Sequence, residues 1–256
     1  KIRVEGLMQI RLAKKNLITL VEQTKVMLRQ HVSFEKSDLT GRMITYFIYK
    51  QLDHAMSVIK LDPSMDTVLI ARTMIEGVIN LTWVLEQPET RVEDWFNYSS
   101  VYDFNLLKDK ESGGSFISDN DRNNVLENYE KNASAFLTKK GNRHHDNFRK
   151  GNNLSNISKD NTDLEYFYQN YKYFSDWVHW GSQSLRHVID EQENEISYYE
   201  QEHIYRAPAL VIAFGSLLDI VAKTSEHFGL EQDEALEEIS NQMLEDLKNT
   251  GMKFDE

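Results

Sequence analysis

The chain has 256 residues, of which 40% are hydrophobic and 27% are charged, and its formal net charge is −12. It contains no cysteine, which excludes a disulfide framework and thiolate metal sites. The negative charge disfavours broad binding to DNA, because the surface repels polyanions overall. We expect a cytoplasmic protein without a signal peptide, since the N-terminus alternates charged and apolar residues.

The charge is unevenly distributed along the chain. Residues 1–60 and 131–160 carry an excess of basic side chains, whereas residues 61–130 and 161–256 are acidic. A local basic patch can contact phosphate groups although the whole chain is acidic. We predict such a phosphate or RNA contact near Lys139–Lys150.

Apolar residues recur with a helical period in the first part of the chain. They predict an N-terminal amphipathic helix within residues 1–37, a second helix over 38–60, and an apolar third helix over 65–87. Pro63 separates the second helix from the third, and Pro88 ends the third.

Three sequence patterns predict further helix starts. Thr90-Arg91-Val92-Glu93 and Thr162-Asp163-Leu164-Glu165 have the form of capping boxes, and Ser118 is a predicted N-cap. The helix after Thr162 is rich in aromatic residues and is expected to reach Ile189. Residues 138–160 are polar, without apolar anchors, and predict a mobile loop.

The last part of the chain predicts an apolar helix over residues 204–228 and an acidic helix within residues 230–256. Val68–Leu85 and Ala209–Ala222 are apolar enough to suggest membrane spans, but both contain charged residues, and the second is short. We therefore interpret both as buried core helices and expect no membrane contact. The whole pattern predicts one all-α domain over residues 1–256, a helical bundle of about seven or eight helices.

Polar side chains interrupt three of these apolar helices at helical spacing. They form three sets: Arg72, Glu76 and Asn80 on the third helix; Ser175, His179 and Gln183 on the aromatic helix; Ser216 and Asp219 on the apolar helix that follows. Because a buried arginine needs a counter-charge, we predict that the first set faces the interior. We also predict that Arg72 pairs with Glu76, Asp219 or both.

These side chains allow two interpretations. In the first, they form a structural polar network that holds the register of the helices. In the second, they line a pocket in which Arg72 binds an anion and His179 exchanges a proton. The candidate catalytic residues are then Arg72, Glu76 and His179, and the candidate binding or network residues are Asn80, Arg91, Ser175, Gln183 and Asp219.

The segment Ala71-Arg72-Thr73-Met74-Ile75-Glu76-Gly77-Val78-Ile79-Asn80-Leu81 resembles the signature helix of an uncharacterised bacterial family, the domain of unknown function DUF5677. In that family, an Arg-x3-Glu helix precedes an arginine near the start of the next helix and a later Ser-x3-His segment. Arg91, Ser175 and His179 stand at the corresponding places, and the likeness covers about residues 40–225. The resemblance implies an all-helical fold, a bacterial or phage origin and no known activity.

Two functions remain open. One is a non-catalytic helical binding protein in bacterial stress or anti-phage defence. The other is a metal-independent ribonuclease or phosphate-handling enzyme, in which His179 is the general base and Arg72 stabilises phosphate charge. Ribonucleases of the HEPN superfamily are the natural analogy, but they carry Arg and His on one helix with four to six residues between them, and this chain has no such pair.

The aromatic helix also predicts a partner. Its aromatic residues, from Tyr166 to Trp180, cover too much of the circumference for one core seam. We therefore predict a homodimer through an aromatic surface. No cofactor and no metal are expected, because the chain has no Gly-rich phosphate loop and no His-Glu-x-x-His pair.

Overall fold

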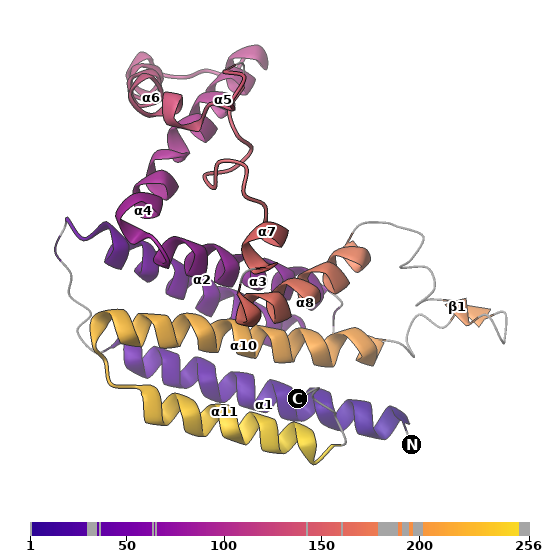
Figure 1. Ribbon diagram of the computed structural model, residues 1–256. Coiled ribbons are helices and arrows are strands. Elements are labelled where there is room, and N and C mark those ends of the chain that lie inside the picture. Colours follow the sequence, from indigo (N-terminus) through magenta and orange to yellow (C-terminus); the bar gives the residue numbers. More distant parts are fainter. Residues whose placement is uncertain are drawn as a thin grey trace. The chain divides into compact units, whose positions relative to one another are not determined.

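The computed structural model describes residues 2–29, 35, 37–62, 64, 66–141, 143–159, 161–178, 189–190, 195–196 and 202–250. Most of these residues lie in helices (Figure 1), which confirms the prediction of an all-α fold. A short antiparallel pairing joins β1 (Ile189–Asp190) to β2 (Glu195–Ile196). Because Ile189 pairs with Ile196, the prediction that the aromatic helix reaches this residue is wrong.

The chain divides into two compact units. Unit 1 consists of residues 1–82 and 158–256, and unit 2 consists of residues 83–157. The boundaries fall inside helix α3 (Asp66–Leu85) and helix α7 (Leu154–Lys159). The prediction of a single domain is not tested by this division and stays a prediction.

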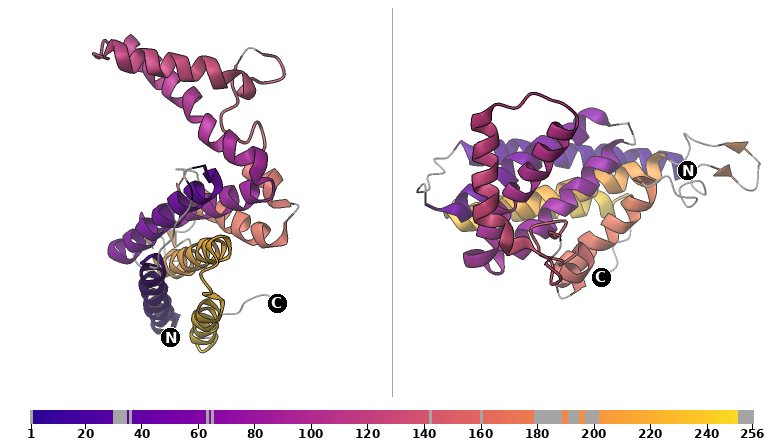
Figure 2. Two further views of the ribbon diagram at one scale, coloured as in Figure 1. Left: turned by 90° about the vertical axis from the view of Figure 1, so that its left-hand side faces the viewer. Right: turned by 90° about the horizontal axis from the view of Figure 1, so that it is seen from above.

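Unit 1 is a helical bundle that brings together the first and the last helix of the chain. Helix α10 (Glu202–Phe228) packs against α1 (Ile2–Leu28), α2 (Leu39–Leu61) and α11 (Asp233–Lys248), and α1 also contacts α2 and α11. Figure 1 and Figure 2 show these four helices side by side. The first part of α3 and helix α8 (Thr162–Val178) belong to the same unit.

The core of unit 1 follows from the helical spacing of apolar residues. On α10, Leu210, Ala213, Leu217 and Ile220 recur every three or four residues and are fully buried. Each large aliphatic side chain buried in this way contributes about 1.5–3 kcal/mol. The predicted apolar and acidic C-terminal helices are therefore present as α10 and α11.

Two of the helices are long and apolar enough to cross a membrane by length and composition alone. They are Asp66–Leu85 and Tyr205–Phe228, with a mean hydropathy of 1.5 in each apolar window. Inside the structure, 50% and 61% of these windows are buried. The core helices of soluble proteins show the same properties, so the length and composition of α3 and α10 do not indicate a membrane protein by themselves.

Unit 2 contains a helical hairpin. Helices α5 (Ser99–Ser112) and α6 (Asp119–Asn132) pack against each other (Figure 1), after α4 (Pro88–Asn97) and before the 3₁₀ helix η1 (Ala133–Phe136). A small apolar cluster is formed by Val101, Ala133 and Phe136, with Tyr98 and Tyr129 packed against it.

Two of the three predicted helix starts agree with the structure, since α6 follows Ser118 and α8 begins at Thr162. Ser118 caps α6, since its Oγ accepts a hydrogen bond from the backbone N–H of Asp121. Helix α4 begins at Pro88 instead of Thr90, because proline at the first helical position has a suitable φ and no N–H to satisfy. At α8 the side chain that accepts from the first turn is Asn161, whose Oδ1 lies 3.3 Å from the N–H of Leu164, and not Thr162.

The segment over residues 138–160 has more structure than its composition predicts. It includes α7, and the side chains of Phe148, Leu154 and Ile157 are buried. The premise that this segment has no apolar anchor is therefore wrong. Its mobility stays a prediction.

Candidate functional site

Arg72 is the centre of a polar cluster in unit 1. It lies on α3, and its side chain is half-buried. Its Nε donates to Ser175 Oγ at 2.9 Å, and its Nη2 donates to the hydroxyl of Tyr171 at 2.6 Å. The guanidinium carbon also lies 4.4 Å from the centre of the Tyr171 ring, within the range of a cation–π contact. We call Arg72, Tyr171 and Ser175 the Arg72 cluster.

The two acceptors of the Arg72 cluster are held by their own helix. Tyr171 and Ser175 are one turn apart on α8, so their side chains share one side of this helix. Ser175 Oγ donates to the backbone carbonyl of Tyr171 at 2.7 Å, which orients its lone pairs for the hydrogen bond from Arg72. The Arg-x3-Glu helix and the Ser-x3-His segment of the sequence therefore do meet, through Arg72 and Ser175.

The predicted ion pair of Arg72 is wrong within the part of the chain that the structure describes. Its partners are neutral hydroxyl groups, and neither Glu76 nor Asp219 forms an ion pair with it. Asp219 instead pairs with Lys223, one turn further along α10. A neighbour at i+4 on the same helix is always within reach, whereas a partner on another helix depends on the packing.

The rest of the predicted stripe on α3 is half-buried. Glu76 and Asn80 are neither fully enclosed nor fully exposed. On α10, Ser216 is fully buried, and its Oγ has no hydrogen-bond partner among the described residues. The polar stripe on α3 is thus partly accessible, as a binding site requires, whereas Ser216 on α10 is enclosed.

Arg91 belongs to unit 2 and has local partners. It forms an ion pair with Glu86 at 2.8 Å and a short hydrogen bond to the carbonyl of Trp83. Its guanidinium lies 4.2 Å from the centre of the Trp83 ring. The charge of Arg91 is therefore compensated, whereas Arg72 has no carboxylate partner among the described residues. His179 and Gln183 lie outside the described residues.

A second polar cluster in unit 1, the Asp62 cluster, was not predicted from the sequence. Asp62 follows the last residue of α2, and its side chain is only 8% exposed. One carboxylate oxygen accepts from Arg206 Nη2 at 2.8 Å and Nε at 3.1 Å, and the other accepts from Lys14 at 3.1 Å. This carboxylate links α1, α2 and α10. The sequence signal was the Asp-Pro pair, which indicates only that a helix ends there.

A buried amide joins α2 to α3. Gln51 is 2% exposed, and its Nε2 donates to the backbone carbonyl of Met74 at 2.8 Å. Gly77 leaves room for this amide, because a Cβ at position 77 would lie 2.4 Å from Gln51 Nε2. On the next turn of α2, His54 Nε2 is buried, and no described residue forms a hydrogen bond with it. Burial, together with the nearby Lys50, lowers the pKa of His54 below its usual value.

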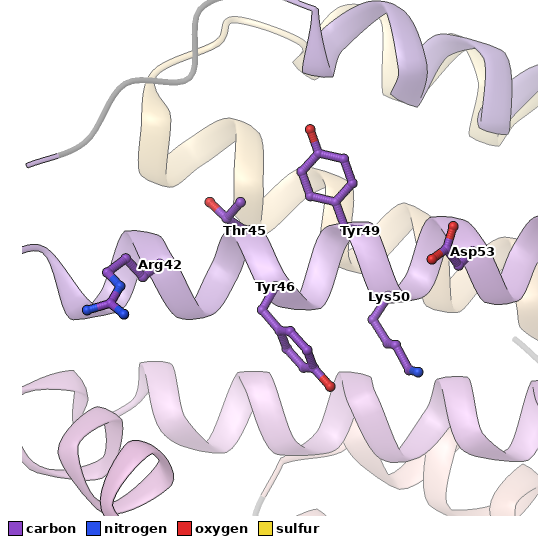
Figure 3. Close-up of a pocket in the computed structure, with 6 residues that line it drawn as sticks. All are labelled: Arg42, Thr45, Tyr46, Tyr49, Lys50 and Asp53. Atoms are coloured by element: carbon purple, nitrogen blue, oxygen red, sulfur yellow. The ribbon is translucent and has the colours of Figure 1, made fainter. Parts of the chain in front are cut away.

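The outer face of α2 carries an open groove with a volume of about 510 Å³. Among the described residues, its lining is formed by Arg42, Thr45, Tyr46, Tyr49, Lys50 and Asp53. In Figure 3, Arg42, Tyr46 and Lys50 extend from one side of the helix, and Tyr49 points to the other. Both tyrosines are 53% exposed. All these side chains come from one helix, so the described part of the groove has no second element that would fix the orientation of a ligand.

Unit 2 contains a basic turn over residues 138–143. Lys139, Lys140 and Arg143 are exposed and surround a hollow of about 390 Å³, which Thr138 also lines. None of the three cations forms an ion pair with a described residue. The turn is closed by a hydrogen bond from the N–H of Thr138 to the carbonyl of Arg143 at 2.8 Å. Gly141 has a φ of 67°, a left-handed conformation that glycine adopts without strain.

The aromatic helix α8 has both buried and exposed rings. Phe174 is fully buried and Phe167 nearly so, whereas Tyr166 is 54% exposed. Tyr173 stacks on Tyr205 of α10 with their ring centres 5.1 Å apart, and burial raises the pKa of Tyr173. The predicted homodimer through this aromatic surface stays a prediction.

The fold and the contacts define an all-helical protein with an arginine-centred polar cluster between two of its helices. The model of a family of unknown function (DUF5677) matches residues 48–196, and the chain belongs to this family. The match includes Arg72, Arg91, Ser175 and His179 but not Asp219, so it is shorter than the predicted likeness over residues 40–225. Comparison with curated proteins and with solved structures found no match.

Proposed function

We propose that the protein is a non-catalytic binding protein and that the Arg72 cluster holds an oxyanion of its ligand. The observation that supports this proposal is the pairing of a half-buried guanidinium with two neutral hydroxyl groups. Burying a charge without a counter-charge is costly. An anionic group beside Arg72 offsets that cost, and phosphate matches the planar fork of a guanidinium well.

The hydrogen bonds of Arg72 leave donors for such a ligand. A guanidinium has five N–H donors, and the contacts to Tyr171 and Ser175 use two of them. These contacts and the Tyr171 ring hold the plane of the guanidinium in one orientation. A preorganised fork loses less entropy when it binds an oxyanion than a free side chain does.

The enzymatic alternative depends on His179. A metal-independent ribonuclease or other phosphate-handling enzyme would use Arg72, Glu76 and His179. His179 lies outside the described residues, and the contacts that the structure describes hold and orient the guanidinium of Arg72, so we argue for the binding protein. The predicted setting in bacterial stress or anti-phage defence and the cytoplasmic localisation stay predictions.

The test is a titration of the protein with inorganic phosphate, in which two-dimensional NMR spectra record the backbone amide of each residue. We expect saturable shifts at Arg72, Tyr171 and Ser175 in the wild type and none in Arg72→Gln. A second titration uses acetate in place of phosphate. It shows whether the site prefers phosphate or binds carboxylates equally well. Arg11→Gln is the matched control, because Arg11 is exposed on α1 and its loss changes the net charge equally.

Arg72→Lys refines this test. Lysine keeps the charge but loses the fork, so we expect weaker phosphate binding with the same amides affected. Shifts of equal size in the wild type and Arg72→Gln would show that phosphate does not bind at the Arg72 cluster, and the proposed function would be wrong.

A further inference from the structure

The basic turn in unit 2 has three features that the Arg72 cluster does not explain. Lys139, Lys140 and Arg143 place three exposed cations on six residues, without a carboxylate partner among the described residues. The whole chain, by contrast, carries a net charge of −12. A concentrated positive patch on an acidic protein attracts anions to this place and not to the rest of the surface.

Backbone hydrogen bonds hold the described residues of the turn, 138–141 and 143. Leu137 and His144 form an isolated antiparallel bridge at its base, and the N–H of His145 donates to the carbonyl of Phe136 at 2.8 Å. Within the turn, the N–H of Gly141 donates to the carbonyl of Thr138 at 2.7 Å. Phe136 is fully buried in the small core of unit 2, so the base of the turn is anchored. Lys139, Lys140 and Arg143 are thus placed between backbone contacts that fix both ends of the turn.

Thr138 supplies a further reason to expect a ligand. It lines the hollow, but its Oγ1 is buried without a hydrogen-bond partner among the described residues. Buried hydroxyl groups in proteins normally have a partner. Rotation of this side chain toward the hollow would give the hydroxyl a phosphate oxygen as acceptor.

We propose that the basic turn, residues 138–143, binds the phosphate backbone of a single-stranded nucleic acid. Three neighbouring cations suit a series of phosphates better than one phosphate, which one or two basic side chains neutralise. A flexible strand can contact the turn alone, whereas a rigid duplex would hold much of its charge close to the other residues of unit 2, which are acidic in sum. This inference is independent of the proposed function, because Arg72 belongs to unit 1 and the turn to unit 2.

The experiment is fluorescence anisotropy with the full chain and a labelled single-stranded RNA of about a dozen nucleotides. Each phosphate neutralised on a single strand contributes about −0.7 to the slope of log affinity against log salt, so three contacts predict a slope of about −2. Affinity should then fall about 20-fold between 50 and 200 mM salt. DNA of the same sequence, the corresponding duplex and pyrophosphate are the comparison ligands.

The variant that tests the turn combines Lys139→Gln, Lys140→Gln and Arg143→Gln. All three side chains are exposed, so the variant should keep its fold, which circular dichroism checks. We expect its RNA affinity to fall roughly 10-fold or more and its salt slope to approach zero. The control combines Lys108→Gln, Lys110→Gln and Lys131→Gln, which removes the same charge from exposed positions of the α5–α6 hairpin.

Four results would overturn the inference. They are no RNA binding by the wild type, an equal loss in the control variant, competition by pyrophosphate as effective as that by RNA, and loss of RNA binding in Arg72→Gln. Effective competition by pyrophosphate would show that the turn binds a small phosphate ligand. Loss of RNA binding in Arg72→Gln would show that RNA binds at the Arg72 cluster. Retained RNA binding in Arg72→Gln supports the turn, even if phosphate fails to bind at Arg72.

Discussion

The Asp62 cluster and the Arg72 cluster are both polar groups packed among the helices of unit 1, but they differ in the partners of their cations. Asp62 is a nearly buried carboxylate that accepts hydrogen bonds from two cations on two other helices. Arg72 is a half-buried cation that donates to two neutral hydroxyl groups. In the first cluster both cations contact a carboxylate, whereas the hydrogen-bond partners of Arg72 among the described residues are neutral.

The difference indicates which polar cluster stabilises the fold and which one is available to a ligand. Removing one partner from a buried ion pair leaves the other charge uncompensated, which is strongly destabilising. Removing a cation from neutral, partly accessible partners costs less, because water can replace the lost hydrogen bonds. The stabilities of variants at the two sites should therefore differ clearly.

The largest expected effect is that of Asp62→Ala. Because Arg206 and Lys14 would lose their common counter-charge, we expect the free energy of unfolding to fall by about 3–5 kcal/mol. Urea denaturation followed by circular dichroism measures it. Asp53→Ala, at an accessible position on the groove of α2, should change stability by no more than about 0.5 kcal/mol. A similar loss of stability in both variants would show that the Asp62 cluster does not stabilise the fold more than an exposed carboxylate does.

A smaller loss is expected for Gly77→Ala, which tests a neutral polar contact near Arg72 on α3. The new Cβ would clash with the Gln51 amide and break its hydrogen bond to Met74, at a cost of about 1–3 kcal/mol. The measurement is a double-mutant cycle with Gln51→Ala, because the clash disappears when the amide is gone. If the effects of the two substitutions on the free energy of unfolding were additive, the Gln51 amide would not be the group that a side chain at position 77 displaces.

Arg72→Gln should destabilise the protein by about 1–2 kcal/mol, less than Asp62→Ala, because both partners of Arg72 are neutral. Its main effect should appear in the presence of phosphate. At about ten times the dissociation constant, phosphate should stabilise the wild type by roughly 1.4 kcal/mol. Urea denaturation with and without phosphate should show this gain in Arg11→Gln but not in Arg72→Gln.

The smallest effect is the pH dependence that comes from His54. Burial and the neighbouring Lys50 lower the pKa of His54, whereas Asp53 raises it by less. The unfolded chain then binds a proton near pH 6.5 that the folded chain accepts only at lower pH, so stability falls as the pH drops below about 6.5. His54→Gln should flatten this part of the stability profile between pH 7 and 5. An unchanged profile would assign the dependence to other groups.

Much of the fold followed from the sequence, because helical periodicity is a local property. The polar stripe on α3 was visible as a spacing of four residues, and α10 as a run of aliphatic residues with the same period. Boundaries were less predictable. Both Pro88 and the Thr90 pattern can begin a helix. Helix α4 begins at Pro88, whose φ is already fixed near the helical value.

The sequence by itself determined that the chain is all-helical, that Arg72 lies on an apolar helix, and that the basic patch lies near Lys139–Lys150. It could not determine partners. Arg72 meets Tyr171 and Ser175 across about a hundred residues of chain, and Asp62 meets Arg206 across an even longer stretch. A hydrogen bond needs its atoms to lie about 3 Å apart, and only the packing of one helix on another decides which side chains reach that distance.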